Sequence, residues 1–229
     1  MAEQYLMEHI DVPEIRMIVV DKAIAEKDYQ QVEKLCKEAI EKKIRGHFTR
    51  PAPWPYYLEQ IYAETGKQDE LTETVRYILF QRDTAYFMKL KNIYQQQGVW
   101  KEKEELLWQE LSKKLPVNEY AALLERQGEM VKLLDVVKQW PSLVLYYGKQ
   151  MAINFPEETY KIFEEYILKE AHAATDRRKY KQVCRMIKDF AQVGAKEKAI
   201  NLIDRLSEMY VRRPAMVEEL GGMKRKLGT

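Results

Sequence analysis

The amino-acid sequence predicts an all-α protein, an α-α superhelix of about six antiparallel helical pairs. Helix-forming residues dominate, because the 229 residues include only 9 Gly and 8 Pro and β-branched residues rarely cluster. An apolar pattern with helical spacing recurs along the chain, and each copy ends at a residue suited to stop a helix. A second apolar stripe follows most stops, as expected for paired helices.

The recurring pattern defines the first helix of each predicted pair. Leu58-x-x-Ile61-Tyr62-x-x-x-Gly66 recurs as Leu90-x-x-Ile93-Tyr94-x-x-x-Gly98 and, in degraded form, as Tyr120-x-x-Leu123-Leu124-x-x-x-Gly128. One partial copy contains Val20, Ala23, Ile24 and Asp28, in which Asp28 replaces the stop glycine, and another contains Met186, Phe190 and Gly194. Positions three and four apart share one helix face, so each copy forms an apolar stripe. Glycine accepts the left-handed conformation at low cost, and we predict that conformation at Gly66, Gly98 and Gly194.

The second helices carry stripes of their own. These stripes comprise Val32, Leu35, Cys36, Ala39 and Ile40; Leu71, Val75, Ile78 and Leu79; and Ala199, Ile200, Ile203 and Leu206. The predicted pairs span residues 13–44, 54–81, 83–114, 118–139, 141–172 and 176–210. We expect a single helical-repeat domain over residues 1–229 with a short basic tail at about 221–229.

A repeat period in the low thirties is that of the tetratricopeptide family. The run from Lys27 to Val32, with Cys36 and Ala39 after it, resembles the start and second helix of that repeat. Gly66 and Gly194, each followed by the apolar stripe of the next helix, resemble the same part of the repeat. The family's small residues are often replaced here by Leu, Val or Lys103, so the resemblance implies an α-solenoid with irregular units and leaves its pitch and groove open.

Residues 155–220 carry a second resemblance, to the helical C-terminal tail of bacterial SWIM zinc-finger proteins. It is carried by Pro156-Glu157-Glu158, Tyr160, Tyr166, Arg177-Arg178-x-Tyr180, Val183 and Arg212-Arg213-Pro214-Ala215. The separate Cys-x-Cys and Cys-x-His zinc module of that family has no counterpart here. The resemblance therefore implies a helical tail without zinc.

Composition favours a cytoplasmic protein. The N-terminal residues are acidic where a signal peptide would be basic and then apolar, and no run of about 20 apolar residues could span a bilayer. Cys36 and Cys184 are the only cysteines, too few for a secreted disulfide scaffold. Residues 1–115 hold 18 basic and 20 acidic residues, whereas residues 175–229 hold 14 and 7, so the positive charge lies at the C-terminal end.

The sequence contains no recognisable catalytic or metal-binding motif. His9, His47 and His172 are isolated, and the common hydrolase, nucleotide and zinc signatures do not occur. Cys184 lies on an apolar stripe, which predicts a buried structural thiol rather than a nucleophile. We therefore expect no enzyme activity, no cofactor and no metal.

The segment from Arg45 to Tyr57 is the longest break in the helical pattern. Its prolines favour an extended backbone, and Arg45, His47, Arg50, Trp54 and Tyr56 could bind an anion or a ring. The alternative is a stiff connector in which Trp54 and Tyr57 close the seam between the first two pairs.

Two further sets of residues are candidate binding positions. In a solenoid the first helices line the concave face, which makes polar residues of these helices candidate groove residues: Lys89, Asn92, Gln96, Arg126 and Lys149. The basic run that includes Arg177, Arg178, Lys181 and Arg185 could contact phosphates, or it could be an ordinary solvated face.

The preferred functional hypothesis is a non-enzymatic scaffold that binds a peptide or a partner domain along the superhelix. The first alternative is a nucleic-acid-associated accessory module that uses the basic C-terminal region, and the second is an enzyme with unfamiliar residues around Arg45 and His47. No membrane partner is expected.

Overall fold

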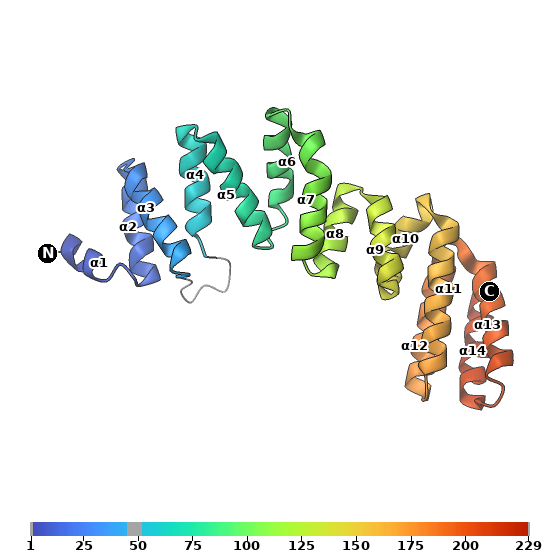
Figure 1. Cartoon of the computed structure of the whole chain (residues 1–229). Helices are drawn as coiled ribbons and strands as arrows, with labels where there is room; N and C mark the ends of the chain where they lie inside the picture. Colours follow the sequence, from blue (N-terminus) through green and yellow to red (C-terminus); the bar gives the residue numbers. More distant parts are fainter. Residues whose placement is uncertain (1, 45–51, 229) are drawn as a thin grey trace. The chain divides into compact units, whose positions relative to one another are not determined.

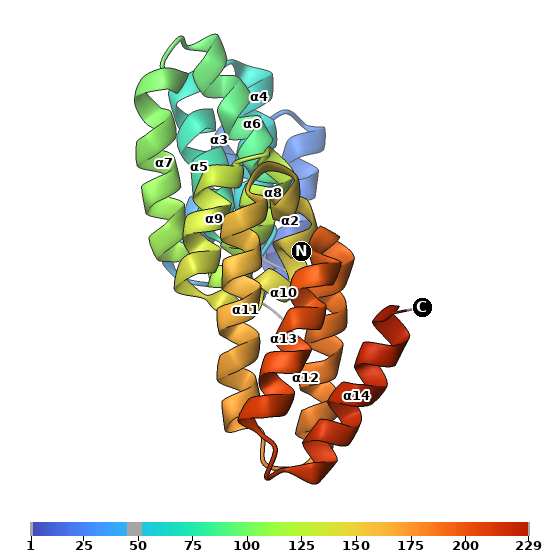
Figure 2. The ribbon, with the colours of Figure 1, turned by 90° about the vertical axis from the view of Figure 1, so that its right-hand side faces the viewer.

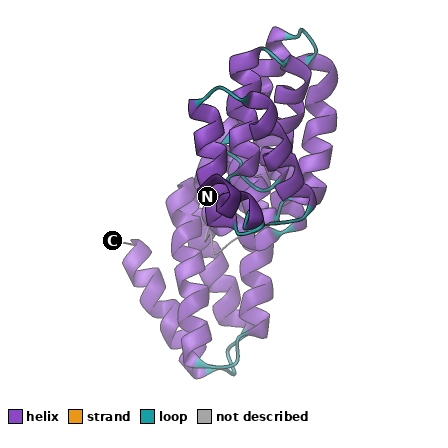
Figure 3. Ribbon diagram, turned by 90° about the vertical axis from the view of Figure 1, so that its left-hand side faces the viewer, coloured by secondary structure: helices purple, strands orange, loops and turns teal. Residues whose placement is uncertain are grey.

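In the computed structural model, the described residues, 2–44 and 52–228, form helices and the turns between them and contain no strand (Figure 3). The prediction of an all-α fold is confirmed. Among these residues no helix combines the length and the apolar character needed to cross a membrane.

The chain forms two compact units, Met1–Pro116 (unit 1) and Val117–Thr229 (unit 2). Unit 1 contains α1 (Ala2–Glu8), α2 (Pro13–Ala25), α3 (Tyr29–Glu41), α4 (Trp54–Thr65), α5 (Gln68–Phe80), α6 (Tyr86–Gln96) and α7 (Trp100–Lys114). Each of these helices packs against the next one along the chain (Figure 1). The repeat pattern alone does not mark the boundary at residue 116.

The recurring stripes supply the core of unit 1. Leu58, Ile61 and Tyr62 of α4 are buried, and so are their equivalents Leu90, Ile93 and Tyr94 of α6. The second stripes of α3 and α5 are buried against them, with Val32, Cys36, Val75 and Leu79 fully enclosed. A helix of 11 to 13 residues is marginal alone, so this burial stabilises each helix through its neighbours.

Unit 2 contains α8 (Val117–Gln127), α9 (Met130–Gln139), η1 (Pro141–Leu143), α10 (Val144–Asn154), α11 (Pro156–Ala173), α12 (Arg177–Phe190), η2 (Ala191–Ala195), α13 (Lys196–Met209) and α14 (Pro214–Gly228). Its packing is not limited to consecutive helices, because α12 contacts α10, α11, α13 and α14 (Figure 2). The last helix was not anticipated from the repeat. It covers α12 and α13 with Met216 and Leu220, and it includes residues 221–228, where the sequence suggests a basic tail.

Left-handed residues end several helices. The φ angles of Gly66, Gly98 and Gly194 are 70°, 74° and 96°, which confirms the predicted conformation. The expectation that Asp28 replaces the stop glycine is wrong. Lys27 carries the positive φ instead, and Asp28 is the N-cap of α3, where its carboxylate accepts a hydrogen bond from the backbone N–H of Gln31.

A buried arginine joins the beginning of α2 to α3. The side chain of Arg16 is fully buried, and its guanidinium donates to the carbonyl oxygens of Leu35 (2.8 Å) and Ile10 (3.0 Å) and to the carboxylate of Asp11 (3.2 Å). A buried charge is tolerated when such partners surround it. No sequence pattern singled out this residue.

Replacing Gly98 with valine should lower the free energy of unfolding by about 1 kcal/mol or more, because a β-branched residue is strained at positive φ. A Cβ at this position would meet no atom within 4 Å, so the loss would come from the backbone alone. Urea titration would measure it. The control is Gln97→Val, at the preceding residue with an ordinary φ of −76°. Equal stability of the two variants would contradict the assigned helix end.

Gly148 tests a different constraint, the close approach of α10 to α11. A Cβ there would lie 2.4 Å from Cε2 of Phe163, a buried ring. Gly148→Ala should therefore cost about 1–3 kcal/mol through overpacking. Thermal melting of this variant and of Gly148→Ala with Phe163→Leu would check the cause, since the smaller side chain should recover part of the loss. A single variant as stable as the parent would refute the contact.

Candidate functional site

The structure describes only part of the proline-containing segment. Arg45, His47 and Arg50 lie outside the described residues. Trp54 is 1% exposed, and its indole N–H donates to the carbonyl oxygen of Ile44 at 2.7 Å. Trp54 is thus a core residue that joins the beginning of α4 to the residues after α3, and its ring is not available to stack on a ligand.

Tyr56 and Lys89 meet in a polar cluster between α4 and α6, together with Glu59, Asp83 and Tyr86. Glu59 is 8% exposed, and it accepts a hydrogen bond from the Tyr86 hydroxyl at 2.5 Å and pairs with the Lys89 ammonium. The Tyr56 hydroxyl donates to Asp83 at 2.9 Å. The carboxylate of Glu59 is therefore bound by side chains of α6, and the cluster connects α4 to α6.

Sequence analysis missed Glu59, the centre of this α4–α6 cluster. It directly follows the stripe residue Leu58, and the pattern marks apolar positions only. The distance of 30 positions between Glu59 and Lys89 is close to one repeat period, which places them on neighbouring first helices. This separation is the feature of the sequence from which the pairing of Glu59 with Lys89 could have been predicted.

Tyrosine hydroxyls form similar bonds throughout unit 1. In its described part the donors and acceptors are Tyr29–Glu64, Tyr56–Asp83, Tyr57–Asp21, Tyr62–Glu33 and Tyr86–Glu59, at 2.5 to 3.0 Å. Burial and the neighbouring carboxylates raise the pKa of Tyr56 and of Tyr62 to about 12. These hydroxyls therefore stay protonated near neutral pH and act as fixed donors.

The remaining candidates in α6 form an exposed polar face. Asn92 and Gln96 are exposed and follow Lys89 at spacings of three and seven residues, so all three lie on one side of the helix. Arg126 belongs to α8 of unit 2, where its Nε donates to the carbonyl oxygen of Ala122 at 3.4 Å. Three of the predicted groove residues thus share one face of α6 in unit 1, whereas Arg126 belongs to unit 2.

A surface of exposed apolar side chains lies on α10. Tyr146 is 79% exposed and Ile153 is 69% exposed, and with Lys149 they occupy positions i, i+3 and i+7 of one face, here called the α10 patch. The adjacent Tyr147 points to a different environment, since burial and Glu125 raise the pKa of its hydroxyl. Sequence analysis left both tyrosines unassigned.

The structure divides the basic run of α12 into two groups. Arg177 is engaged by α14, because its guanidinium binds Glu218 (2.5 Å) and Glu219 (2.7 Å). Arg178, Lys181 and Arg185 are exposed. On the other side of the helix Cys184 is 5% exposed, and burial raises the pKa of its thiol to about 11, as expected for a structural cysteine.

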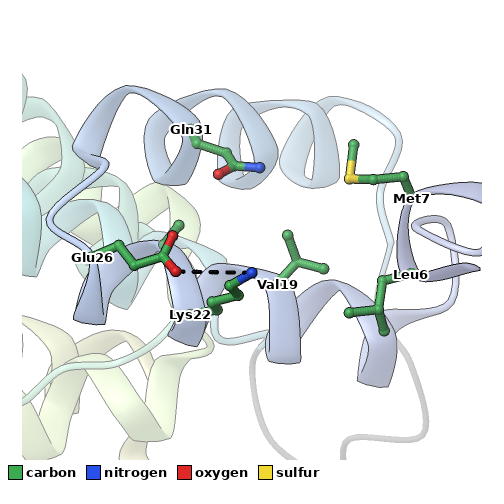
Figure 4. Close-up of a pocket in the computed structure, with 7 residues that line it drawn as sticks. Leu6, Met7, Val19, Lys22, Glu26 and Gln31 are labelled. Atoms are coloured by element: carbon green, nitrogen blue, oxygen red, sulfur yellow. Dashed lines mark ion pairs between the residues drawn. The ribbon is translucent and has the colours of Figure 1, made fainter. Parts of the chain in front are cut away.

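Surface grooves occur in unit 1, but they gather no catalytic set. One of about 250 Å³ lies between α1, α2 and α3 and is lined by Leu6, Met7, Val19, Lys22, Ala23, Glu26 and Gln31 (Figure 4). Another, of about 500 Å³, lies between α5 and α7 beside the Arg76–Glu110 ion pair. Within residues 2–44 and 52–228, no group of three His, Cys, Asp or Glu side chains is placed to hold a metal ion.

Glu33 forms a charged junction between α3 and the end of α4. Its carboxylate accepts hydrogen bonds from Lys37 (2.7 Å), Lys67 (2.7 Å) and the Tyr62 hydroxyl (3.0 Å). These donors, the two lysines foremost, lower the pKa of Glu33 from 4.5 to about 2. The side chain is only 21% exposed, so the interaction is partly shielded from solvent.

Comparison with known proteins adds no family assignment: no family model matches the chain, and no curated protein matches it. The tetratricopeptide and SWIM resemblances therefore stay predictions.

Glu33→Gln should lower the free energy of unfolding by about 1–3 kcal/mol near neutral pH, because charge-assisted hydrogen bonds are lost. The folded-state pKa lies below the unfolded value, so this stabilisation is present above pH 4.5 and is lost as the pH falls towards 2. The difference between parent and variant should shrink over that range.

Urea denaturation at a series of pH values would measure the effect of Glu33. Glu41→Gln is the control, since Glu41 is an exposed carboxylate of the same helix. A difference between the parent and Glu33→Gln that stays constant from pH 7 to pH 3 would contradict the assigned ion pairs.

Proposed function

We propose that this protein is a non-enzymatic interaction scaffold, a tetratricopeptide-like α-solenoid of about six antiparallel helical pairs that binds a peptide or partner domain. The consecutive packing of α2 to α7 supports the repeat architecture. Arrays of this kind present extended surfaces on regularly stacked helices.

The observation that carries the proposal is the α10 patch. Tyr146 and Ile153 extend into solvent from a helix whose other face buries Val144, Gly148 and Met151. Single exposed apolar residues are common, but two large ones on one helix face leave apolar area that a partner could bury. Tyrosine is enriched among residues that contribute most to binding.

Two features favour a binding role over catalysis. Both cysteine thiols are buried with raised pKa values, Cys36 to about 12, which disfavours a thiolate nucleophile. Two partly buried carboxylates of unit 1, Glu33 and Glu59, bind lysine and tyrosine side chains of neighbouring segments. These groups support the packing of helices and lie in no shared reaction site.

The proposal is tested by quantitative co-purification from the cells that express the protein, comparing the parent with Tyr146→Ala combined with Ile153→Ser. We expect a specific protein to be enriched with the parent and to fall by about tenfold or more with the variant, since interface anchors contribute about 2 kcal/mol or more.

The matched control removes two other exposed apolar residues of unit 2, as Val131→Ser combined with Val211→Ser. It should retain the partner, and all variants should keep the helical circular-dichroism spectrum. Enrichment of no protein, or equal retention by the α10 variant, would overturn the proposal.

A further inference from the structure

Four exposed cations define one side of α12. Arg178, Lys181, Arg185 and Lys188 follow one another at spacings of three, four and three residues, which places them on a single helix face. We call this face the α12 basic stripe. With a rise of about 1.5 Å per residue, it extends over roughly 15 Å.

Several other cations of unit 2 form ion pairs. Lys198, Arg205 and Lys224 pair with Glu157, Glu164 and Asp204. Arg177, at the beginning of the same helix, is held by two glutamates of α14. No ion pair links the stripe to a carboxylate of the described residues.

The surroundings of the stripe do not neutralise it. Asp176 caps the helix through the backbone N–H of Lys179, and Asp189 is half-buried, which raises the pKa of its carboxyl. Like charges three and four residues apart destabilise a helix by a few tenths of a kcal/mol per pair. Asp176 and Asp189 offset this repulsion only in part, through the charges of Arg178 and Lys188, and an anionic ligand would relieve the rest.

The stripe is also rigidly placed. The opposite face of α12 buries Tyr180, Val183, Cys184, Ile187 and Phe190. Contacts with four other helices of unit 2 fix its orientation. A partner would therefore meet a preorganised row of charges, which limits the entropy lost on binding.

We propose that the α12 basic stripe binds an acidic helical segment of a partner protein, whose carboxylates repeat at spacings of three and four residues. This inference rests on the proposed scaffold function and names the chemistry of one partner. An acidic helix of about three turns matches the length and the spacing of the row. Nucleic acid is less favoured because the run's aromatic residue, Tyr180, is buried and offers no ring for base stacking.

The test is fluorescence anisotropy with the full chain and a fluorescein-labelled, alanine-rich peptide that carries four glutamates at spacings of three, four and three. A peptide of the same composition with its glutamates distributed around the helix, and a short DNA duplex, are the comparison probes. Titrations at about 50 and about 150 mM NaCl separate screened charge attraction from a shape-specific fit.

We expect the patterned peptide to bind more tightly than the rearranged one. Arg178→Gln, Lys181→Gln, Arg185→Gln and Lys188→Gln together should weaken binding by about tenfold or more. The control removes four exposed cations from other segments, as Lys161→Gln, Lys169→Gln, Lys196→Gln and Arg212→Gln, with the same change in net charge. It should alter the affinity by less than about twofold. Circular dichroism and melting would verify the fold of both variants.

Several outcomes would overturn this inference. Equal weakening by the two variants would show that net charge alone attracts the peptide, and equal binding of the two peptides would remove the role of spacing. Tighter binding of DNA, lost with the stripe variant, would assign the surface to nucleic acid. If co-purification recovers a partner and the stripe variant still binds it, the role of the stripe is refuted but the scaffold function is not. If co-purification recovers no partner, the scaffold function itself is refuted.

Discussion

Each helix from α2 to α7 has an apolar stripe that only another helix can cover. The helices of unit 1 are short, and each stripe contributes three to five side chains that water would otherwise hydrate. Because each helix packs against the next, Leu58 and Ile61 of α4 become core only when α3 and α5 are in place. We therefore expect unit 1 to depend on cooperation between neighbours more than on any single contact.

Buried polar side chains also connect neighbouring helices, because they form hydrogen bonds where two helices meet. Trp54 reaches a backbone carbonyl, Arg16 reaches two, and tyrosine hydroxyls reach carboxylates of adjoining segments. A buried polar atom without a partner would cost about 1–3 kcal/mol, so these bonds restrict how neighbouring helices can align. They also occupy Lys89, a side chain that the repeat pattern had suggested for ligand binding.

Two surfaces of unit 2 have no such partners within the described residues and are therefore candidates for binding other molecules. The α10 patch exposes apolar area that folding leaves uncovered, and the cations of the α12 basic stripe form no ion pair with the residues that the structure describes. Both belong to unit 2, in which α14 covers α12 and α13 and leaves the basic side of α12 free. The proposed scaffold function would explain both surfaces, because a partner could bury the apolar area and pair with the charges.

The sequence by itself determined the helices from α2 to α13, because burial against any neighbour requires the same spacing. Val32, Val75, Leu90 and Leu123 were all expected in the core and are buried there, and the glycine stops at 66, 98 and 194 follow from backbone sterics that act within a few residues. Local physics of this kind can be read along the chain.

The tertiary structure decided which side chains are exposed and which are bound by residues far away in the sequence. Arg177 and Arg178 are adjacent and chemically alike, yet only the first meets Glu218 and Glu219, about 40 positions later. Tyr146 and Tyr147 are likewise identical in type, yet only the packing of α10 decides which one faces solvent. Which member of each pair is free to bind depends on long-range packing, and periodicity along a single helix does not encode it.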